Sequence, residues 1–167
     1  QFNLLNMSVI TRIPTANESP DTTNGIGGDV AVASPSNTGH AFTSAQGTNN
    51  LVDKTCRWHT FQNLQVGNRI SVKLKVTHTS EGVLSGPSAQ NRFNLSYTVN
   101  GGGAWTDIVN LTDFTTSQGP TAEEITLSNT VDLTQVQVRD IIEGLSLDPG
   151  DTGRADATIS GIKIEVT

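Results

Sequence analysis

The sequence has 167 residues and a mass of 17.7 kDa, a size that suits a single domain. The 16 acidic residues outnumber the ten basic ones and leave a net charge of −6, so a face that neutralises nucleic acid phosphates is not expected. No apolar run reaches the ~18 residues of a membrane-spanning helix, and the expected functions therefore exclude nucleic acid binding and a membrane span.

The chain opens with a predicted strand over residues 2–13, which ends at Pro14. The apolar residues that define this strand are Phe2, Leu4, Val9 and Ile13. Residues 15–50 are rich in Gly, Ser, Thr and Asn, which predicts a long irregular segment interrupted by a short strand at 29–32. Loops of this length are usually functional or bound to a partner.

From residue 51 onward, alternating apolar and polar residues predict a succession of β-strands. These strands cover residues 54–61, 70–76, 93–99, 105–111, 125–127, 136–138 and 157–166. A polar loop is expected at 80–91, and residues 139–145 fit either one helical turn or the end of a strand. The apolar phase slips by one residue at Ser160-Gly161, which predicts a β-bulge.

Eight to ten strands joined by Gly, Pro and Asn turns are typical of an all-β antiparallel β-sandwich of jelly-roll type, with little or no helix. We expect residues 1–167 to form one such domain. Within it, residues 1–14 form a strand that can pair with a neighbouring subunit. Residues 15–50 form the irregular segment that gives this strand its reach.

One hairpin carries a resemblance to a known motif. The run Thr98-Val99-Asn100-Gly101-Gly102-Gly103-Ala104-Trp105 resembles the Asp-box hairpin of sialidase-type propellers and other secreted β-proteins, with Asn100 in place of the Asp. The resemblance implies that the Asn100 side chain caps the turn, that the glycines take positive φ and that Trp105 packs against the sheet. It implies a hairpin and not a glycosidase, because propellers repeat the box and this chain has it once. More loosely, residues 92–140 resemble segments of secreted or virion-associated β-sandwich proteins of bacteria and phages.

Several features point to a secreted location. The chain begins with Gln1-Phe2 and not with Met, which predicts that a leader has been removed. The lone Cys56 excludes an intrachain disulfide and is expected to fill a small core position. Candidate glycosylation sites are the four sequons at Asn6, Asn17, Asn94 and Asn110. We therefore expect an extracellular, cell-surface or virion location.

The strongest candidate for chemistry is a cluster of carboxylates in one Gly-containing loop. Asp148, Asp151 and Asp156 can supply oxygen ligands to Ca²⁺, or they can be solvated beside Arg154. No cofactor other than this calcium ion is expected. The sequence has no nucleophile elbow, phosphate loop or H-x-x-x-H pair, and we expect no enzymatic activity.

The segment from Cys56 to Phe61 can be read in two phases. Either the even residues, Cys56 and Trp58, face the core, or the odd residues, His59 and Phe61, do so. Core packing of Trp58 is the simpler reading. The alternative is a glycan platform in which Trp58 stacks on a sugar and Arg57 or His59 supplies polar contacts.

Two functions fit these observations. The first, which we favour, is a non-enzymatic structural subunit of an extracellular filament or of a virion surface or tail. It would associate with copies of itself or with other subunits by pairing the strand of Phe2, Leu4, Val9 and Ile13 with a neighbouring sheet edge. The alternative is a carbohydrate-binding module or adhesin of jelly-roll type, with glycans as partners.

Overall fold

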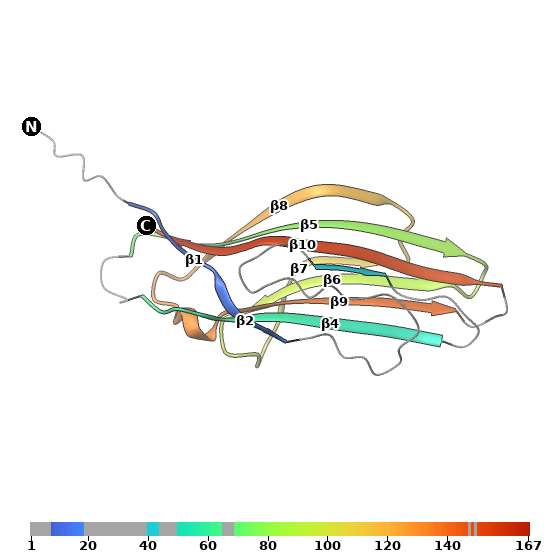
Figure 1. Cartoon of the computed structure of the whole chain (residues 1–167), viewed down its shortest axis with the longest axis horizontal. Helices are drawn as coiled ribbons and strands as arrows, with labels where there is room; N and C mark the ends of the chain where they lie inside the picture. The colour runs from blue at the N-terminus through green and yellow to red at the C-terminus, as the bar shows by residue number, and fades with distance from the viewer. Residues whose placement is uncertain (1–7, 19–39, 44–49, 65–68, 147, 149) are drawn as a thin grey trace, which may run out of the picture.

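The computed structural model describes residues 8–18, 40–43, 50–64, 69–146, 148 and 150–167, which form two antiparallel β-sheets packed face to face (Figure 1). The first sheet contains β1 (Ile10–Arg12), β3 (His40–Thr43), β5 (Val72–Ser85), β8 (Ser117–Leu127) and β10 (Thr152–Val166). The second contains β2 (Pro14–Glu18), β4 (Asn50–Phe61), β6 (Gln90–Thr98), β7 (Thr106–Thr112) and β9 (Gln137–Ser146). A single 3-10 turn, η1 (Leu133–Gln135), precedes β9. The predicted all-β antiparallel sandwich is therefore confirmed.

The strand order is that of a jelly roll. The first sheet runs β3-β10-β5-β8 and the second runs β4-β9-β6-β7, so the chain changes sheet at every connection from β3 to β10 except the β6–β7 hairpin. β1 and β2 are additional to these eight strands and lie at the edges beside β10 and β4. None of the helices in the described part of the chain is long and apolar enough to cross a membrane.

The core lies between the sheets and is built by the alternation of side chains along the central strands. β10 alternates buried and half-buried residues along almost its whole length, and β5 does the same from Val72 to Ser80. The fully buried large apolar side chains are Phe61, Phe93, Leu74, Leu95, Leu133, Ile142, Ile159, Ile162 and Ile164.

Two backbone irregularities keep apolar side chains facing this core. The register of β10 against β5 shifts between Ser160 and Lys163, and Gly161 has a φ of 64°, so the predicted bulge is confirmed and both Ile159 and Ile162 are buried. In β4 the same role falls to Thr60, whose φ is 63°. Because Thr60 resets the alternation, Trp58 and Phe61 are both buried, and neither of the two predicted phases of this segment is right on its own.

Some element bounds differ from the sequence predictions. The loop predicted at 80–91 is restricted to 86–89, because the second half of β5 pairs with β10 as far as Ser85 and with β8 as far as Glu81. Residues 139–145 are strand and not helix, and Ile70 lies outside β5 and is exposed. The strand predicted at 29–32 lies outside the described residues.

The N-terminal strand does not end at Pro14. β1 pairs with β10 in the first sheet, and after Ile13 the chain continues as β2, which starts at Pro14 and pairs with β4 in the second sheet. Figure 1 shows this segment crossing from one sheet to the other at the end of the sandwich where the C-terminus lies. Pro14 is tolerated because its missing N–H falls on an edge strand.

Candidate functional site

Large apolar side chains are exposed at one end of the sandwich. Among the described residues these are Val9, Ile10, Ile13, Ile70 and Val99, with exposed fractions of 40% to 60%. Val9, Ile10 and Ile13 belong to the β1 segment, Ile70 precedes β5, and Val99 follows β6, so the topology brings all five to the same end. We call this set the apolar end.

The β1 segment pairs with the first sheet at the apolar end. In the described part of the chain, this pairing joins Ile10, Thr11 and Arg12 to β10, through the register Ile10↔Val166 to Arg12↔Ile164. Ile70 lies across β10 from this segment, because its N–H donates to the carbonyl of Thr167 at 2.6 Å. Val9 and Ile13, two of the four residues predicted to mediate assembly, are thus exposed on a short strand. The other two, Phe2 and Leu4, lie outside the described residues.

Backbone strain accompanies the crossing from β1 to β2. Thr60 is a β-branched residue with positive φ, which is an uncommon conformation for this residue type. It lies opposite the start of β2, where the Thr15 hydroxyl donates to its carbonyl oxygen at 2.7 Å. The Thr60 hydroxyl is also 2.8 Å from Nδ1 of His59. The strained residue therefore supports the point at which the N-terminal segment changes sheet.

The hairpin between β6 and β7 has the geometry that its resemblance implies. Asn100 Oδ1 accepts hydrogen bonds from the backbone N–H groups of Gly103 at 3.0 Å and Ala104 at 3.1 Å. Gly101 and Gly102 have φ values of 71° and 102°, which a residue with a Cβ rarely adopts. The capped turn delivers Trp105, which is half-buried, to the outer face of the second sheet.

A row of polar residues crosses that outer face. The strand registers place Arg57 opposite Arg139, Arg139 opposite Ser96, and Ser96 opposite Asp107, on β4, β9, β6 and β7 in turn. Ser96 is fully buried although it lies outside the sandwich core, and Arg139 Nε donates to its hydroxyl at 3.4 Å. The polar residues that alternate with the core residues of β6, which are Asn94, Ser96 and Thr98, are all buried.

Two guanidinium groups lie against the Trp105 ring. The Arg139 guanidinium carbon lies 4.0 Å from the ring centroid and that of Arg57 lies 5.7 Å from it, within range of cation–π attraction. Burial lowers the pKa of Arg139, and the charges of Arg57 and Arg92 lower it further, while Asp107 raises it. Sequence analysis missed Arg139. The signal that could have found it is strand alternation, because a residue next to the buried Val138 faces outward.

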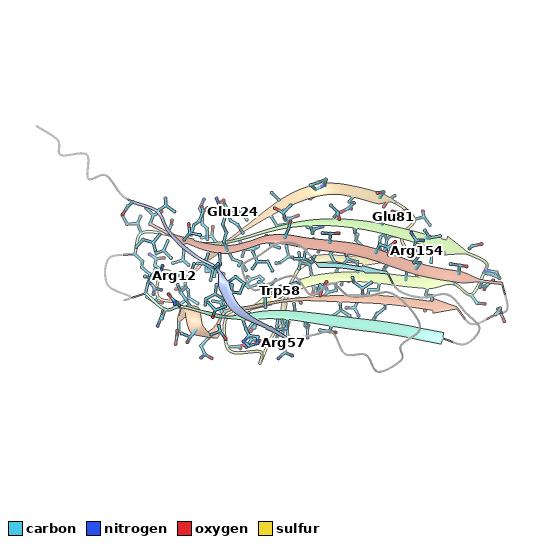
Figure 2. All side chains as sticks on the ribbon, viewed as in Figure 1. Arg12, Arg57, Trp58, Glu81, Glu124 and Arg154 are labelled. Carbon is cyan, nitrogen blue, oxygen red and sulfur yellow. The ribbon has the colours of Figure 1, made fainter. Side chains whose placement is uncertain are left out.

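The predicted core packing of Trp58 is confirmed, and the alternative, a glycan platform at this residue, is wrong. Trp58 is only 2% exposed and packs between the sheets, so no sugar ring can stack on it (Figure 2). Its neighbour Arg57 points the other way, toward the outer face, as expected for adjacent residues of a strand. His59 is half-buried and bonded to Thr60. The side chain of Cys56 lies outside the part of the structure that can be described.

The three candidate calcium ligands do not come together. Asp148 and Asp151 both bind Ser88, whose hydroxyl donates to Asp148 Oδ2 at 2.5 Å and whose N–H donates to Asp151 Oδ2 at 2.9 Å. Asp156 lies on β10, where its carboxylate is 2.7 Å from Arg154 Nη2. In the part of the chain that the structure describes, no three His, Cys, Asp or Glu residues gather as metal ligands would. Asp148 and Asp151 alone remain as candidate donors.

The sequons differ in accessibility. Asn94 is 1% exposed, and its Nδ2 donates to Asp107 Oδ1 at 2.8 Å, so attachment of a sugar there is incompatible with this fold. Asn110 is exposed on β7 and remains a candidate site. Asn17 pairs with Trp58 in the β2–β4 register, and Asn6 lies outside the described residues.

The fold and these surfaces define a jelly-roll β-sandwich protein with an apolar end and a guanidinium–indole pair on one sheet. No family model matches the chain, and no curated protein matches it.

Among solved structures, the chain aligns with a family 11 carbohydrate-binding module from Clostridium thermocellum in complex with a β-1,3-1,4-mixed-linked tetrasaccharide. The identity is 12%, the alignment covers 89% of this chain and 94% of that one, and the TM-score is 0.24. It also aligns with a chain of infectious bursal disease virus, Gx strain, at 12% identity, with 88% and 40% covered and a TM-score of 0.21. Likenesses this weak carry no argument about what this chain does.

Proposed function

We propose that this protein is a non-enzymatic structural subunit that assembles with copies of itself through its N-terminal segment. The observation that carries the proposal is the gathering of the exposed large apolar side chains of the described residues at one end of the sandwich. Single exposed apolar residues are ordinary, whereas several at the same end of a domain favour an interaction surface there.

A second copy of the chain is the occupant that the geometry favours. β1 pairs with β10 over three residues, and a neighbouring β1 can make the same pairs in the same register. The hinge is Ile13-Pro14, where proline keeps the preceding residue extended and so favours an outstretched arm over a tight return. Exchange of the arm would bury Val9 and Ile13 between two subunits.

The opposite edge of the first sheet is a poorer acceptor for a strand. β8 carries Pro120, which removes a backbone donor, and the acidic pair Glu123 and Glu124. Proline and charged side chains on an edge strand oppose pairing with another chain. The site vacated by β1 on β10 is thus the better-suited place for a neighbouring strand, and the association is expected to be directional. A subunit of this kind suits an extracellular filament or a virion surface or tail.

The test compares the mass of particles formed by the intact chain and by its variants. We expect light scattering and negative-stain microscopy to show oligomers for the intact chain and monomers when residues 1–13 are deleted. Ile70→Asp should also weaken assembly, because it places a charge in the apolar end without touching β1. Ser85→Asp is the matched control, since Ser85 is exposed at the other end of β5.

A monomeric intact chain at high concentration would refute the proposal. Oligomers that persist after deletion of residues 1–13 would also refute it, as would equal effects of Ile70→Asp and Ser85→Asp. Circular dichroism on each variant establishes that the sandwich is intact, so that loss of assembly is not confused with unfolding.

A further inference from the structure

β1 and the strand that accepts it lie at the same end of the molecule. The acceptor is the stretch of β10 from Ile164 to Val166. Figure 1 shows that this stretch ends beside the C-terminus, at the end of the sandwich where the N-terminal segment crosses between the sheets. A neighbouring chain that takes up β1 must therefore bring its own apolar end to the apolar end of the first chain.

The hinge between β1 and β2 is a single residue, Ile13. After the hinge, β2 is fixed to the second sheet, because it pairs with β4 and the Thr15 hydroxyl donates to the carbonyl oxygen of Thr60 at 2.7 Å. Since an extended chain advances ~3.3 Å per residue, Arg12 stays within ~7 Å of Pro14 wherever β1 pairs. Two chains that exchange β1 must therefore touch at their apolar ends.

The same hinge favours exchange over return. In a chain that keeps its own β1, Ile13 carries the backbone from the first sheet to the second in one step. Short hinges of this kind invite the exchange of a segment between chains. Pro14 also keeps Ile13 extended, so that β1 reaches a facing chain without a turn.

Two chains that face each other in this way can place both of their β1 strands at once. Each chain has one β1 to give and one stretch of β10 to fill, so a two-fold arrangement uses every donor and every acceptor. An open row of subunits would need each chain to receive β1 from one neighbour and to give its own to another. Because hinge and acceptor share one end, both neighbours would have to occupy that end.

Exchange keeps the strand pairs of β1 and adds an apolar contact between the chains. The pairs from Ile10↔Val166 to Arg12↔Ile164 are the same in both arrangements, so they do not favour either one. Exposed side chains of the apolar end, among them Ile70, can become buried when a second copy covers them. The dimer is therefore expected to be stabilised by the apolar end and shaped by the hinge.

We propose that the exchange of β1 is reciprocal and closes a two-fold dimer, in which the β1 of each chain lies on the β10 of the other. This inference rests on the proposed function and adds the number of chains and their symmetry. A filament or a virion structure built from this protein would then have the closed dimer as its repeating unit. Growth beyond the dimer would need a different surface.

The experiment traps the exchanged strand with a disulfide between two chains. Thr11 lies opposite Glu165 in the β1–β10 register, with Thr11 exposed and Glu165 half-buried. Thr11→Cys and Glu165→Cys are made in separate full chains, which are mixed, unfolded, refolded together and treated with oxidised glutathione. Cysteines opposite each other in antiparallel strands are close enough to form a disulfide. Here they meet only if β1 has passed to the other chain.

The matched control uses two strands of the same sheet that do not exchange. Thr79 lies opposite Thr158 in the β5–β10 register, and both are half-buried on the outer face. Thr79→Cys and Thr158→Cys in separate chains should give no cross-link, whereas both in one chain should form a disulfide within it. Each single variant and the intact chain, which has Cys56, are oxidised alone as further controls.

We expect a covalent dimer from the Thr11→Cys and Glu165→Cys mixture on non-reducing gel electrophoresis. Sedimentation of the intact chain should give a dimer whose mass stays constant as the concentration rises. Insertion of Gly-Ser-Gly-Ser between Ile13 and Pro14 lets β1 return to its own chain and should weaken the dimer about tenfold. The same insertion after Gly86, in the loop between β5 and β6, should leave the dimer unchanged.

The outcomes separate this inference from the proposed function. A monomeric intact chain would refute both. Particles that need residues 1–13 but grow in mass with concentration would leave the proposed function standing and overturn the closed dimer. A dimer without the Thr11–Glu165 cross-link between chains would also overturn it, as would a dimer that the longer hinge does not weaken. Circular dichroism on every variant establishes that each is folded.

Discussion

Asn91 connects three segments of the chain through one side chain. Its Nδ2 donates to the carbonyls of Phe114 and Arg154, each at 2.8 Å, and its Oδ1 accepts from the N–H of Phe114 at 2.9 Å. Because Asn91 is buried, Asn91→Ala leaves these partners unsatisfied and should lower the free energy of unfolding by about 3 kcal/mol in urea denaturation. Asn110→Ala, at an exposed asparagine, should change it by less than about 0.5 kcal/mol. Equal losses would contradict this reading.

Gly161 illustrates a position where a side chain is excluded by backbone conformation. Its φ is 64°, and an added Cβ would lie 3.2 Å from Thr77 Oγ1. Gly161→Ala should therefore destabilise the fold by about 1–2 kcal/mol, the cost of holding an L-residue in this region. Gly119→Ala is the control, because nothing lies within 4 Å of its added Cβ. Thermal melts of the two variants should differ in midpoint, and coincident melts would be inconsistent with a strained bulge.

On the first sheet, an ion-pair ladder spans β8, β5 and β10 and predicts a loss of stability in acid. Glu165 lies 2.7 Å from both Lys163 and Lys75, and Lys75 also lies 3.3 Å from Glu124. Hydrogen bonds from Lys163 and Lys75 lower the pKa of Glu165 from 4.5 to about 2. Since the folded-state pKa lies below the usual value, its stabilising contribution is present above 4.5 and is lost as pH falls through about 2.

NMR titration of the Glu165 carboxyl group should give a midpoint near this lowered value. Glu165→Gln should unfold with a weaker dependence on pH in the same acid range, because its side chain cannot be protonated there. A Glu165 midpoint at 4.5 would show that the ladder does not form in solution.

Most strands could be predicted from the alternation of apolar and polar residues. The irregularities at which this alternation shifts by one residue could be predicted only in part. The slip at Ser160-Gly161 is visible in the sequence because glycine marks it. The reset at Thr60 is not, because a β-branched residue gives no sign of positive φ. The end of β5 from Ser80 onward reads as a loop, yet pairing with β10, and with β8 as far as Glu81, makes it a strand. Local propensity cannot report such long-range pairing.

The candidate sites could likewise be predicted only where they depend on residues that are close in sequence. The Asn100 turn is local, so its capping bonds could be predicted from eight residues. The polar row on the outer face consists of Arg57, Arg139, Ser96 and Asp107. It depends on the registers of four strands that are distant in sequence, so it could not be predicted from the spacing of these residues. The apolar end also arises only when the ends of three strands are brought together.

For the molecule as a whole, the eight-stranded jelly roll should be independent of the N-terminal arm. Deletion of residues 1–13 removes one three-residue pairing and no buried core side chain among the described residues. The melting temperature of the isolated monomer should fall by only ~5 °C, as expected for a loss of about 1–2 kcal/mol in a chain of this size. A collapse of the melting transition in calorimetry would show instead that the arm belongs to the core.

The position of β10 has a consequence for how the chain is made. In the described part of the chain, β1 and β3 join the first sheet by pairing with β10. These two early strands therefore cannot be placed in the sheet until β10, which comes much later in the sequence, is available. On the ribosome, the sheet cannot close until translation has passed Val166, and until then β5 presents an open flank. Contacts so distant in sequence form slowly, and their late formation exposes β-structure to aggregation. The strand order is therefore expected to make folding slow.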